Sequence, residues 1–132
     1  MKLLSPGVHA WLDYALVVVL AVSPLVLDFG GVAATVVWVL AAAQAILSLV
    51  TDYPGGVARM MRFPVHGALE LLVALALLAS PWVFGFADAD APRNLYVATG
   101  IGLLVVWAVT DYRVRDPVMG RAPGGRVPTG PG

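Results

Sequence analysis

The chain has 132 residues, of which 60% are hydrophobic and only 12% are charged, whereas a soluble domain carries about 25% charged residues. This composition predicts a chain whose natural solvent is lipid. Cysteine is absent, which excludes disulfides, thiolate metal sites and iron–sulfur clusters. Eight basic and eight acidic residues give no net charge, so nothing in the charge balance indicates a nucleic-acid partner.

Four apolar stretches are each long enough to cross the roughly 30 Å of hydrocarbon in a bilayer as a helix. Proline and glycine mark their limits: Ser5-Pro6 is typical of a helix start, Pro64 precedes the third stretch, and a Pro-Gly-Gly at 54–56 follows the second. We therefore expect an all-α membrane protein with four transmembrane helices, at about 6–27, 32–51, 65–86 and 95–112.

The basic residues predict how these helices are oriented. Seven of the eight precede the first span, lie between the second and third, or follow the fourth, and only Arg93 lies between the third and fourth. Because basic residues concentrate on the cytoplasmic side, we expect a multi-pass protein of the cytoplasmic (plasma) membrane with both termini in the cytoplasm. The last residues, 116–132, are so rich in glycine and proline that they predict a disordered cytoplasmic tail.

An internal repeat relates the two halves of the chain. The stretch HAWLDYALVVVLAVSPL at 9–25 returns as HGALELLVALALLASPW at 66–82, a spacing of 57, and the Thr-Asp-Tyr at 51–53 returns at 110–112, a spacing of 59. We expect two tandem two-helix repeats, 1–58 and 59–115. Each repeat has an even number of spans, so the repeats are parallel and related by a pseudo-two-fold axis along the membrane normal. Because the first span has an internal copy, it is not a removable signal peptide.

These residues carry a resemblance to a known family. A histidine followed four residues later by an acid, then an apolar run and the Ser-Pro-Trp at 80–82, resembles the SPW-repeat family of small integral membrane proteins. The first copy departs from this pattern because Leu25 stands where the second copy has Trp82. The resemblance implies two-helix units in a membrane, and it implies no established biochemical activity.

The repeated polar residues are the candidate site. His9 and Asp13 lie one helical turn apart on one face, as do His66 and Glu70. A lipid-facing carboxylate costs about 2.5–3.5 kcal/mol near the bilayer centre, so both faces should turn toward the bundle interior. The spans that return to the cytoplasm should bring two more acids to the same depth. The expected polar cluster is His9, Asp13, Asp52, His66, Glu70 and Asp111.

Two roles for this cluster remain open. In the first, each histidine hydrogen-bonds its own acid or a facing one and so fixes the register of the helices. In the second, the cluster binds a divalent cation or relays protons. Gln44, a strongly polar residue within the second span with Leu103 at its counterpart, is a candidate for hydrogen bonding between helices.

Each Ser-Pro pair predicts a local feature of its helix. Pro24 and Pro81 leave carbonyl groups without their usual donors, and Ser23 and Ser80 can bond the backbone nearby. We interpret both pairs as bends that end a helix near the outer interface, and a hinge or a set of carbonyl cation ligands is the alternative. Trp82 is expected to anchor the chain at the membrane interface.

No sequence pattern points to catalysis or to a bound cofactor. The chain has no nucleophile elbow, phosphate-binding glycine motif or zinc-protease motif. We therefore expect a non-enzymatic structural or interaction module of the membrane, with ion or proton handling as the alternative. The expected partners are the lipid bilayer and, through small-residue helix faces, a second copy of the chain or a larger membrane protein.

Overall fold

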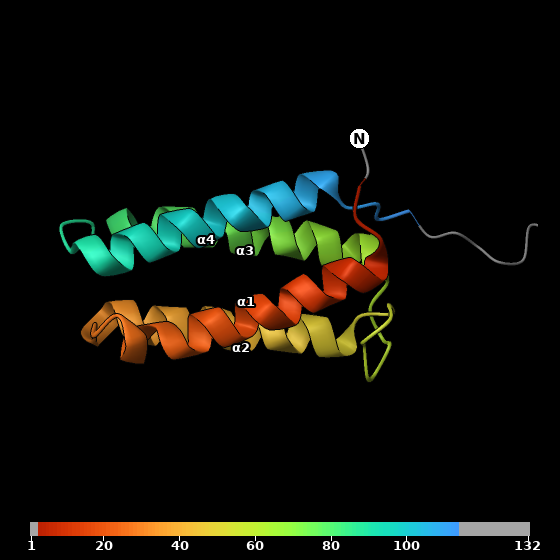
Figure 1. Cartoon of the computed structure of the whole chain (residues 1–132), viewed down its shortest axis with the longest axis horizontal. Helices are drawn as coiled ribbons and strands as arrows, with labels where there is room; N and C mark the ends of the chain where they lie inside the picture. The colour runs from red at the N-terminus through yellow and green to blue at the C-terminus, as the bar shows by residue number, and fades with distance from the viewer. Residues whose placement is uncertain (1–2, 114–132) are drawn as a thin grey trace, which may run out of the picture.

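The structure, a computed structural model, describes residues 3–113 and contains four long helices and no strand within that range (Figure 1). The tail predicted at 116–132 lies outside the described residues, as do Lys2 and the basic residues at 115, 121 and 126. The helices are α1 (Pro6–Val26), α2 (Gly31–Val50), α3 (Phe63–Val83) and α4 (Asp90–Val109).

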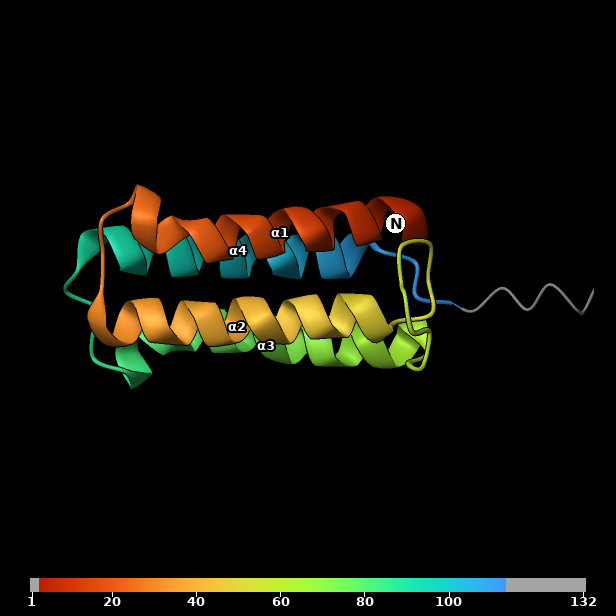
Figure 2. The same ribbon diagram turned by 90° about the horizontal axis from the view of Figure 1, so that it is seen from below.

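The helices form an antiparallel bundle. The most extensive packing joins α1 to α2 and α3 to α4, and smaller contacts join α2 to α3 and α1 to α4 (Figures 1 and 2). The order around the bundle is therefore α1, α2, α3, α4, with α1 and α3 diagonally opposite. We call the end where α1 and α3 begin and where α2 and α4 finish the terminal end, and the other end the loop end.

All four helices are long and apolar enough to cross a membrane. Their outer surface is apolar, and it includes Trp11 and Trp82, whose exposed fractions are 80% and 62%. Lipid replaces water around such a surface, so its exposure is the expected state of a membrane protein. The chain is thus an integral four-helix membrane protein, as its composition predicts.

The fourth helix begins five residues before the predicted start at about 95, so that boundary was wrong. Its first turn contains polar residues that an apolar span does not include. Asp90 lies in this turn, where a carboxylate is favourable for the helix dipole, and it pairs with Arg93 at 2.6 Å. The helix therefore extends past the apolar stretch into the polar interface.

Short backbone pairings close the terminal end. Residues 3–4 lie beside 109–111, and residues 60–61 lie in the same way beside 50–52. The first set of hydrogen bonds runs from the Leu3 and Leu4 amides to the Val109 carbonyl and from the Asp111 amide to the Leu4 carbonyl. The second set runs from the Met60 and Met61 amides to the Val50 carbonyl and from the Asp52 amide to the Met61 carbonyl. These pairings fix the backbone just after α2 and α4.

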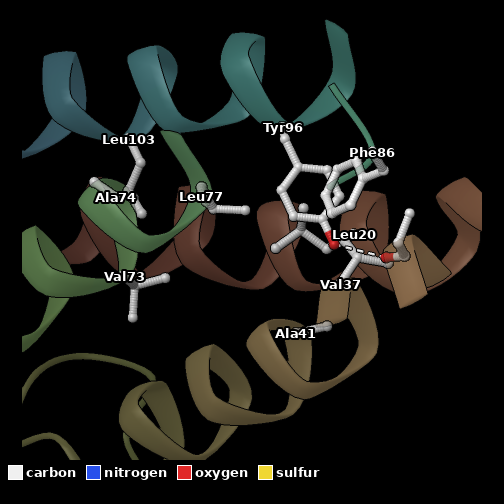
Figure 3. Close-up of a cluster of buried hydrophobic side chains, with 10 residues drawn as sticks. Leu20, Val37, Ala41, Val73, Ala74, Leu77, Phe86, Tyr96 and Leu103 are labelled. Atoms are coloured by element: carbon white, nitrogen blue, oxygen red, sulfur yellow. Dashed lines mark hydrogen bonds between the residues drawn. The ribbon is translucent and has the colours of Figure 1, made fainter. Parts of the chain in front are cut away.

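Apolar side chains from all four helices fill the rest of the bundle (Figure 3). Leu20, Val37 and Leu77 have no exposed surface. Nearer the loop end, the buried Tyr96 of α4 donates a hydrogen bond to the Ala33 carbonyl of α2 at 2.6 Å. This bond links the two hairpins at the end of the bundle away from the termini.

The Ser-Pro pairs lie at the ends of their helices. Helix α1 ends two residues after Pro24, and α3 ends two residues after Pro81. The Ser23 hydroxyl donates to the Leu20 carbonyl, which the proline leaves without its usual donor, at 2.9 Å. In α3 the Ser80 hydroxyl instead donates one residue earlier, to the Ala76 carbonyl, at 2.6 Å.

The close packing of α3 against α4 at Gly100 predicts how two glycine substitutions in α4 affect stability. A Cβ on Gly100 would lie 2.8 Å from the Leu78 Cγ and 3.2 Å from the Ala74 carbonyl oxygen, whereas a Cβ on Gly102 would meet nothing within 4 Å. Gly100→Ala should therefore destabilise the bundle by about 1–3 kcal/mol through overpacking. Gly102→Ala, the matched control, should be neutral or stabilising because alanine favours the helix. Equilibrium unfolding in mixed micelles measures both, and equal stability of the two variants would contradict the packing described here.

Candidate functional site

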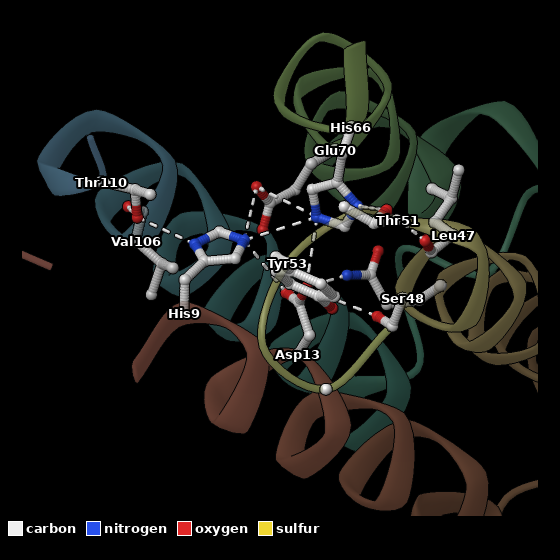
Figure 4. Close-up of polar contacts among 12 residues, drawn as sticks. His9, Asp13, Leu47, Ser48, Thr51, Tyr53, His66, Glu70, Val106 and Thr110 are labelled. Carbon is white, nitrogen blue, oxygen red and sulfur yellow. Dashed lines mark hydrogen bonds and ion pairs between the residues drawn. The ribbon is translucent and has the colours of Figure 1, made fainter. Parts of the chain in front are cut away.

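Four ionisable side chains converge inside the terminal end of the bundle (Figure 4). They are His9 and Asp13 of α1 and His66 and Glu70 of α3, and none is more than 1% exposed. One nitrogen or oxygen from each residue lies within 4.8 Å of those from all the others. We call these four residues the polar centre.

The helices position the polar centre by simple geometry. In each of α1 and α3 the acid follows the histidine by four residues, so the two side chains lie one turn apart on the same face. Both helices begin at the terminal end and lie diagonally across the bundle, so these faces meet at its axis.

Each imidazole is closer to the acid of the other hairpin than to its own. The His9 Nε2 lies 3.3 Å from the Glu70 Oε2 and 3.4 Å from the Asp13 Oδ1. The His66 Nε2 lies 3.2 Å from the Asp13 Oδ2 and 4.0 Å from the Glu70 Oε2. The two Nε2 atoms are 3.4 Å apart. Each histidine therefore contacts both the acid of its own helix, as the sequence predicted, and the acid of the other hairpin, which is nearer.

Two threonines determine which nitrogen of each imidazole carries a proton. The His66 Nδ1 lies 2.8 Å from the Thr51 hydroxyl, and the His9 Nδ1 lies 2.8 Å from the Thr110 hydroxyl. Each hydroxyl donates its single proton to a carbonyl one turn back in its own helix, that of Leu47 or Val106. Since the hydroxyl must then accept from the imidazole, the Nδ1 of each histidine is protonated, and in the neutral ring the Nε2 has a free lone pair.

The two carboxylates differ in how many donors they have. Asp13 accepts hydrogen bonds from the Gln44 amide at 3.1 Å, the Tyr53 hydroxyl at 2.9 Å and the Ser48 hydroxyl at 3.4 Å. Glu70 accepts one side-chain hydrogen bond, from the Tyr112 hydroxyl to its Oε2. The Glu70 Oε1 is buried without a partner among the described residues.

The sequence explains this difference. Thr51 and Tyr53 have counterparts 59 residues later in Thr110 and Tyr112, but the residues at the positions equivalent to Gln44 and Ser48 are Leu103 and Trp107. Neither replacement offers the hydroxyl or amide that Asp13 receives in the first hairpin. Glu70 therefore lacks those two donors.

An aromatic layer covers the polar centre at the terminal end. Phe63 packs against His9 with ring centroids 5.4 Å apart and against Tyr112 at 4.8 Å, and Tyr53 packs beside Phe63 at 5.6 Å. Burial raises the pKa of Tyr53 and of Tyr112 far above the usual value, and the neighbouring carboxylates raise it further. Both phenols are thus protonated donors to the carboxylates beneath them.

The structure brings together four of the six residues that the sequence grouped. Asp52 is exposed and Asp111 is half-buried, and neither joins the polar centre. The chain leaves α2 and α4 in an extended conformation at Thr51 and Thr110, so the threonine and the tyrosine of each Thr-Asp-Tyr turn inward and the aspartate between them turns outward. The repeat of this motif was the signal that could have identified those threonines and tyrosines. Gln44, in contrast, does bond another helix, as the sequence suggested.

Comparison with known proteins agrees with this architecture. No curated protein and no solved structure shows significant similarity to the chain. The family model of the SPW repeat domain matches residues 7–110, a range that includes all four helices except the first residue of α1 and contains the whole polar centre. The chain therefore belongs to the SPW repeat family.

Proposed function

We propose that this chain is a non-enzymatic structural or interaction module of the cytoplasmic membrane, built from two tandem parallel hairpin repeats and locked at its cytosolic end by the polar centre. Equivalent contacts in the two halves support the tandem arrangement. The backbone pairings at the terminal end, the imidazole–threonine pairs and the tyrosine–carboxylate pairs each occur twice, at positions 57 or 59 residues apart.

The observation that carries the proposal is that each hairpin supplies the hydrogen-bond acceptor for the buried histidine of the other. His9 of the first hairpin bonds Thr110 of the second, and His66 of the second bonds Thr51 of the first. A single hairpin would leave its imidazole without this acceptor in a medium that offers few others. The four buried ionisable groups therefore favour one arrangement of the two hairpins over all others.

The distribution of charge supports an orientation with the terminal end in the cytosol. Arg59 and Arg62 lie in the connection between α2 and α3, and Arg113 follows α4 at the same end. Arg93 lies at the loop end. Basic residues are retained on the cytoplasmic side of short loops.

The expected partners are lipid and other membrane-embedded surfaces. Large apolar side chains of every helix face outward, and they include Trp11, Val39, Leu72 and Ile101. Lipid covers such faces, and helices of a second copy or of a larger membrane protein can replace it by close packing.

Ion handling is the second candidate function, and one observation favours it. The groups that meet in the polar centre are two carboxylates and two imidazole nitrogens, all of which accept hydrogen bonds in the neutral-imidazole state. Within residues 3–113, no lysine or arginine forms an ion pair with either carboxylate. Such a group of acceptors is stabilised by a cation at its centre.

The locking role predicts the effect of removing a threonine hydroxyl. Thr51→Val leaves the buried Nδ1–H of His66 without its acceptor and should lower the free energy of unfolding by about 1–3 kcal/mol. Thr99→Val is the matched control, because the Thr99 hydroxyl donates to the Leu95 and Tyr96 carbonyls of its own helix. Thr51→Ser should restore most of the stability. Unfolding in mixed micelles measures all three, and equal losses for Thr51→Val and Thr99→Val would contradict the proposal.

The orientation can be tested by labelling single cysteines, because the chain has none of its own. Ala58→Cys, in the connection between α2 and α3, should react in intact cells only with a membrane-permeant thiol reagent. Asp88→Cys, in the connection between α3 and α4, should be blocked by an impermeant reagent added outside. Both positions are exposed loop sites away from the polar centre. The opposite pattern would place both termini outside and reject the proposed topology.

A further inference from the structure

We propose that the polar centre is a binding site for one divalent first-row transition-metal ion of the Zn²⁺ type, held by the Nε2 atoms of His9 and His66 and by a carboxylate oxygen each from Asp13 and Glu70. The inference rests on the ion-handling candidate above. The structural role rests on the imidazole–threonine pairs and does not require the ion.

The imidazoles are held in the form that binds a metal. Each protonated Nδ1 donates to a threonine hydroxyl at 2.8 Å, so the lone pair of each ring is on the Nε2 that faces the centre. Histidine ligands in metal sites regularly donate their second ring nitrogen to an oxygen acceptor in this way, which fixes the ring and its tautomer.

The distances in the centre are close to the edges of a tetrahedral coordination sphere. Ligand atoms at about 2.0–2.2 Å from a tetrahedral Zn²⁺ are separated by about 3.3–3.6 Å. The two Nε2 atoms are 3.4 Å apart, and the Glu70 Oε2 lies 3.3 Å from that of His9. Asp13 approaches the two imidazoles with different oxygens, His9 with its Oδ1 at 3.4 Å and His66 with its Oδ2 at 3.2 Å. One ligand atom from each of the four residues lies within 4.8 Å of the other three. Binding one ion through a single oxygen of each acid therefore requires a small rotation of Asp13 and a small movement of Glu70, whose Oε2 is 4.0 Å from the His66 Nε2.

The same distances are less suited to protons in the centre. A charged imidazole donates to a carboxylate at about 2.7–2.9 Å, and no imidazole–carboxylate separation here is below 3.2 Å. Two Nε2–H groups would also point at each other across 3.4 Å. Two lone pairs directed at a shared ion are compatible with both separations.

Charge balance favours a doubly charged ion. In the form in which these groups bind a metal, two carboxylates and two neutral imidazoles have a formal charge of −2, and the site has essentially no exposed surface. A buried net charge is costly, and a divalent cation cancels this one.

Glu70 supplies an independent sign of a missing ligand. Its Oε1 is buried and has no partner within residues 3–113, whereas both oxygens of Asp13 have donors. An unpaired buried carboxylate oxygen is costly unless something positive meets it. An ion at the centre, reached by a small movement of Glu70, would satisfy this carboxylate.

The donor set indicates the class of ion. Ca²⁺ and Mg²⁺ take six or more ligands, nearly all of them oxygen. Two nitrogens and two oxygens in a tetrahedral arrangement suit Zn²⁺ and its first-row neighbours, and without cysteine the site has no soft ligand for Cu⁺.

The test begins with the wild-type chain, purified in mild detergent and freed of any histidine tag and of metal by a chelator. Titration with Zn²⁺ should saturate at about one ion per chain and raise the unfolding temperature. Titration with Co²⁺ should give the intense visible absorption of a tetrahedral nitrogen and oxygen site. A folded chain that neither binds Zn²⁺ at micromolar concentration nor gives this spectrum with Co²⁺ overturns the inference.

Variants assign the ion to the polar centre. Glu70→Gln and Asp13→Asn keep the shape of each side chain and should weaken Zn²⁺ binding by more than about 100-fold, while Asp52→Asn, the matched control outside the centre, should leave it unchanged. Thr51→Val should weaken binding by about 10–100-fold by releasing His66. Equal binding by Glu70→Gln and the wild type would place the ion elsewhere and reject the site.

Failure of the metal site and failure of the structural role give different results. If the wild type binds no metal but Thr51→Val destabilises the chain more than Thr99→Val, the inference is wrong and the locking role remains. If Zn²⁺ binds and the two threonine variants unfold alike, the metal site stands and the imidazole–threonine lock does not.

Discussion

A polar group inside a bilayer finds no water to bond, so its partners must come from the protein itself. In this chain that constraint falls on two imidazoles and two carboxylates, none more than 1% exposed. Each hairpin contributes one imidazole and one acid, but some of the hydrogen-bond partners of these groups come from the other hairpin. The threonine that accepts from His9 follows α4, and the one that accepts from His66 follows α2. The arrangement of the two hairpins seen here is therefore the one in which each imidazole finds its threonine acceptor in the other hairpin.

The two ends of the bundle have different roles. At the terminal end, backbone pairings, an aromatic layer and the polar centre combine to define the positions of all four helices. At the loop end, apolar side chains fill the bundle and the Tyr96 hydroxyl joins α4 to α2. Helices in lipid gain little from the hydrophobic effect when they associate. Specific polar contacts at one end and close packing at the other take its place.

The sequence predicted most of the fold and part of the site. Length, hydropathy and proline placement identified four helices, because a bilayer requires long apolar segments and few other signals compete. The spacing of four residues predicted that His9 and Asp13 share a face. The sequence could not show that Thr51 turns inward while Asp52 turns outward, because that depends on the extended backbone beyond the end of α2. Its charge made Asp52 the expected member of the cluster, whereas in the folded chain it is Thr51 that contacts His66.

The reciprocal contacts around the polar centre have a consequence for how such a protein is assembled. A two-helix chain with one histidine, one acid, one threonine and one tyrosine could build the same centre from two identical copies. Each imidazole–threonine and imidazole–carboxylate contact between the hairpins has an equivalent contact in the opposite direction, and each tyrosine–carboxylate bond within one hairpin has an equivalent in the other. Two identical copies would, however, have the same residue at the positions of Gln44 and Leu103. Fusion into one polypeptide removes that obligation, and it lets one acid be surrounded by donors while the other has an oxygen without a partner in the described part of the chain.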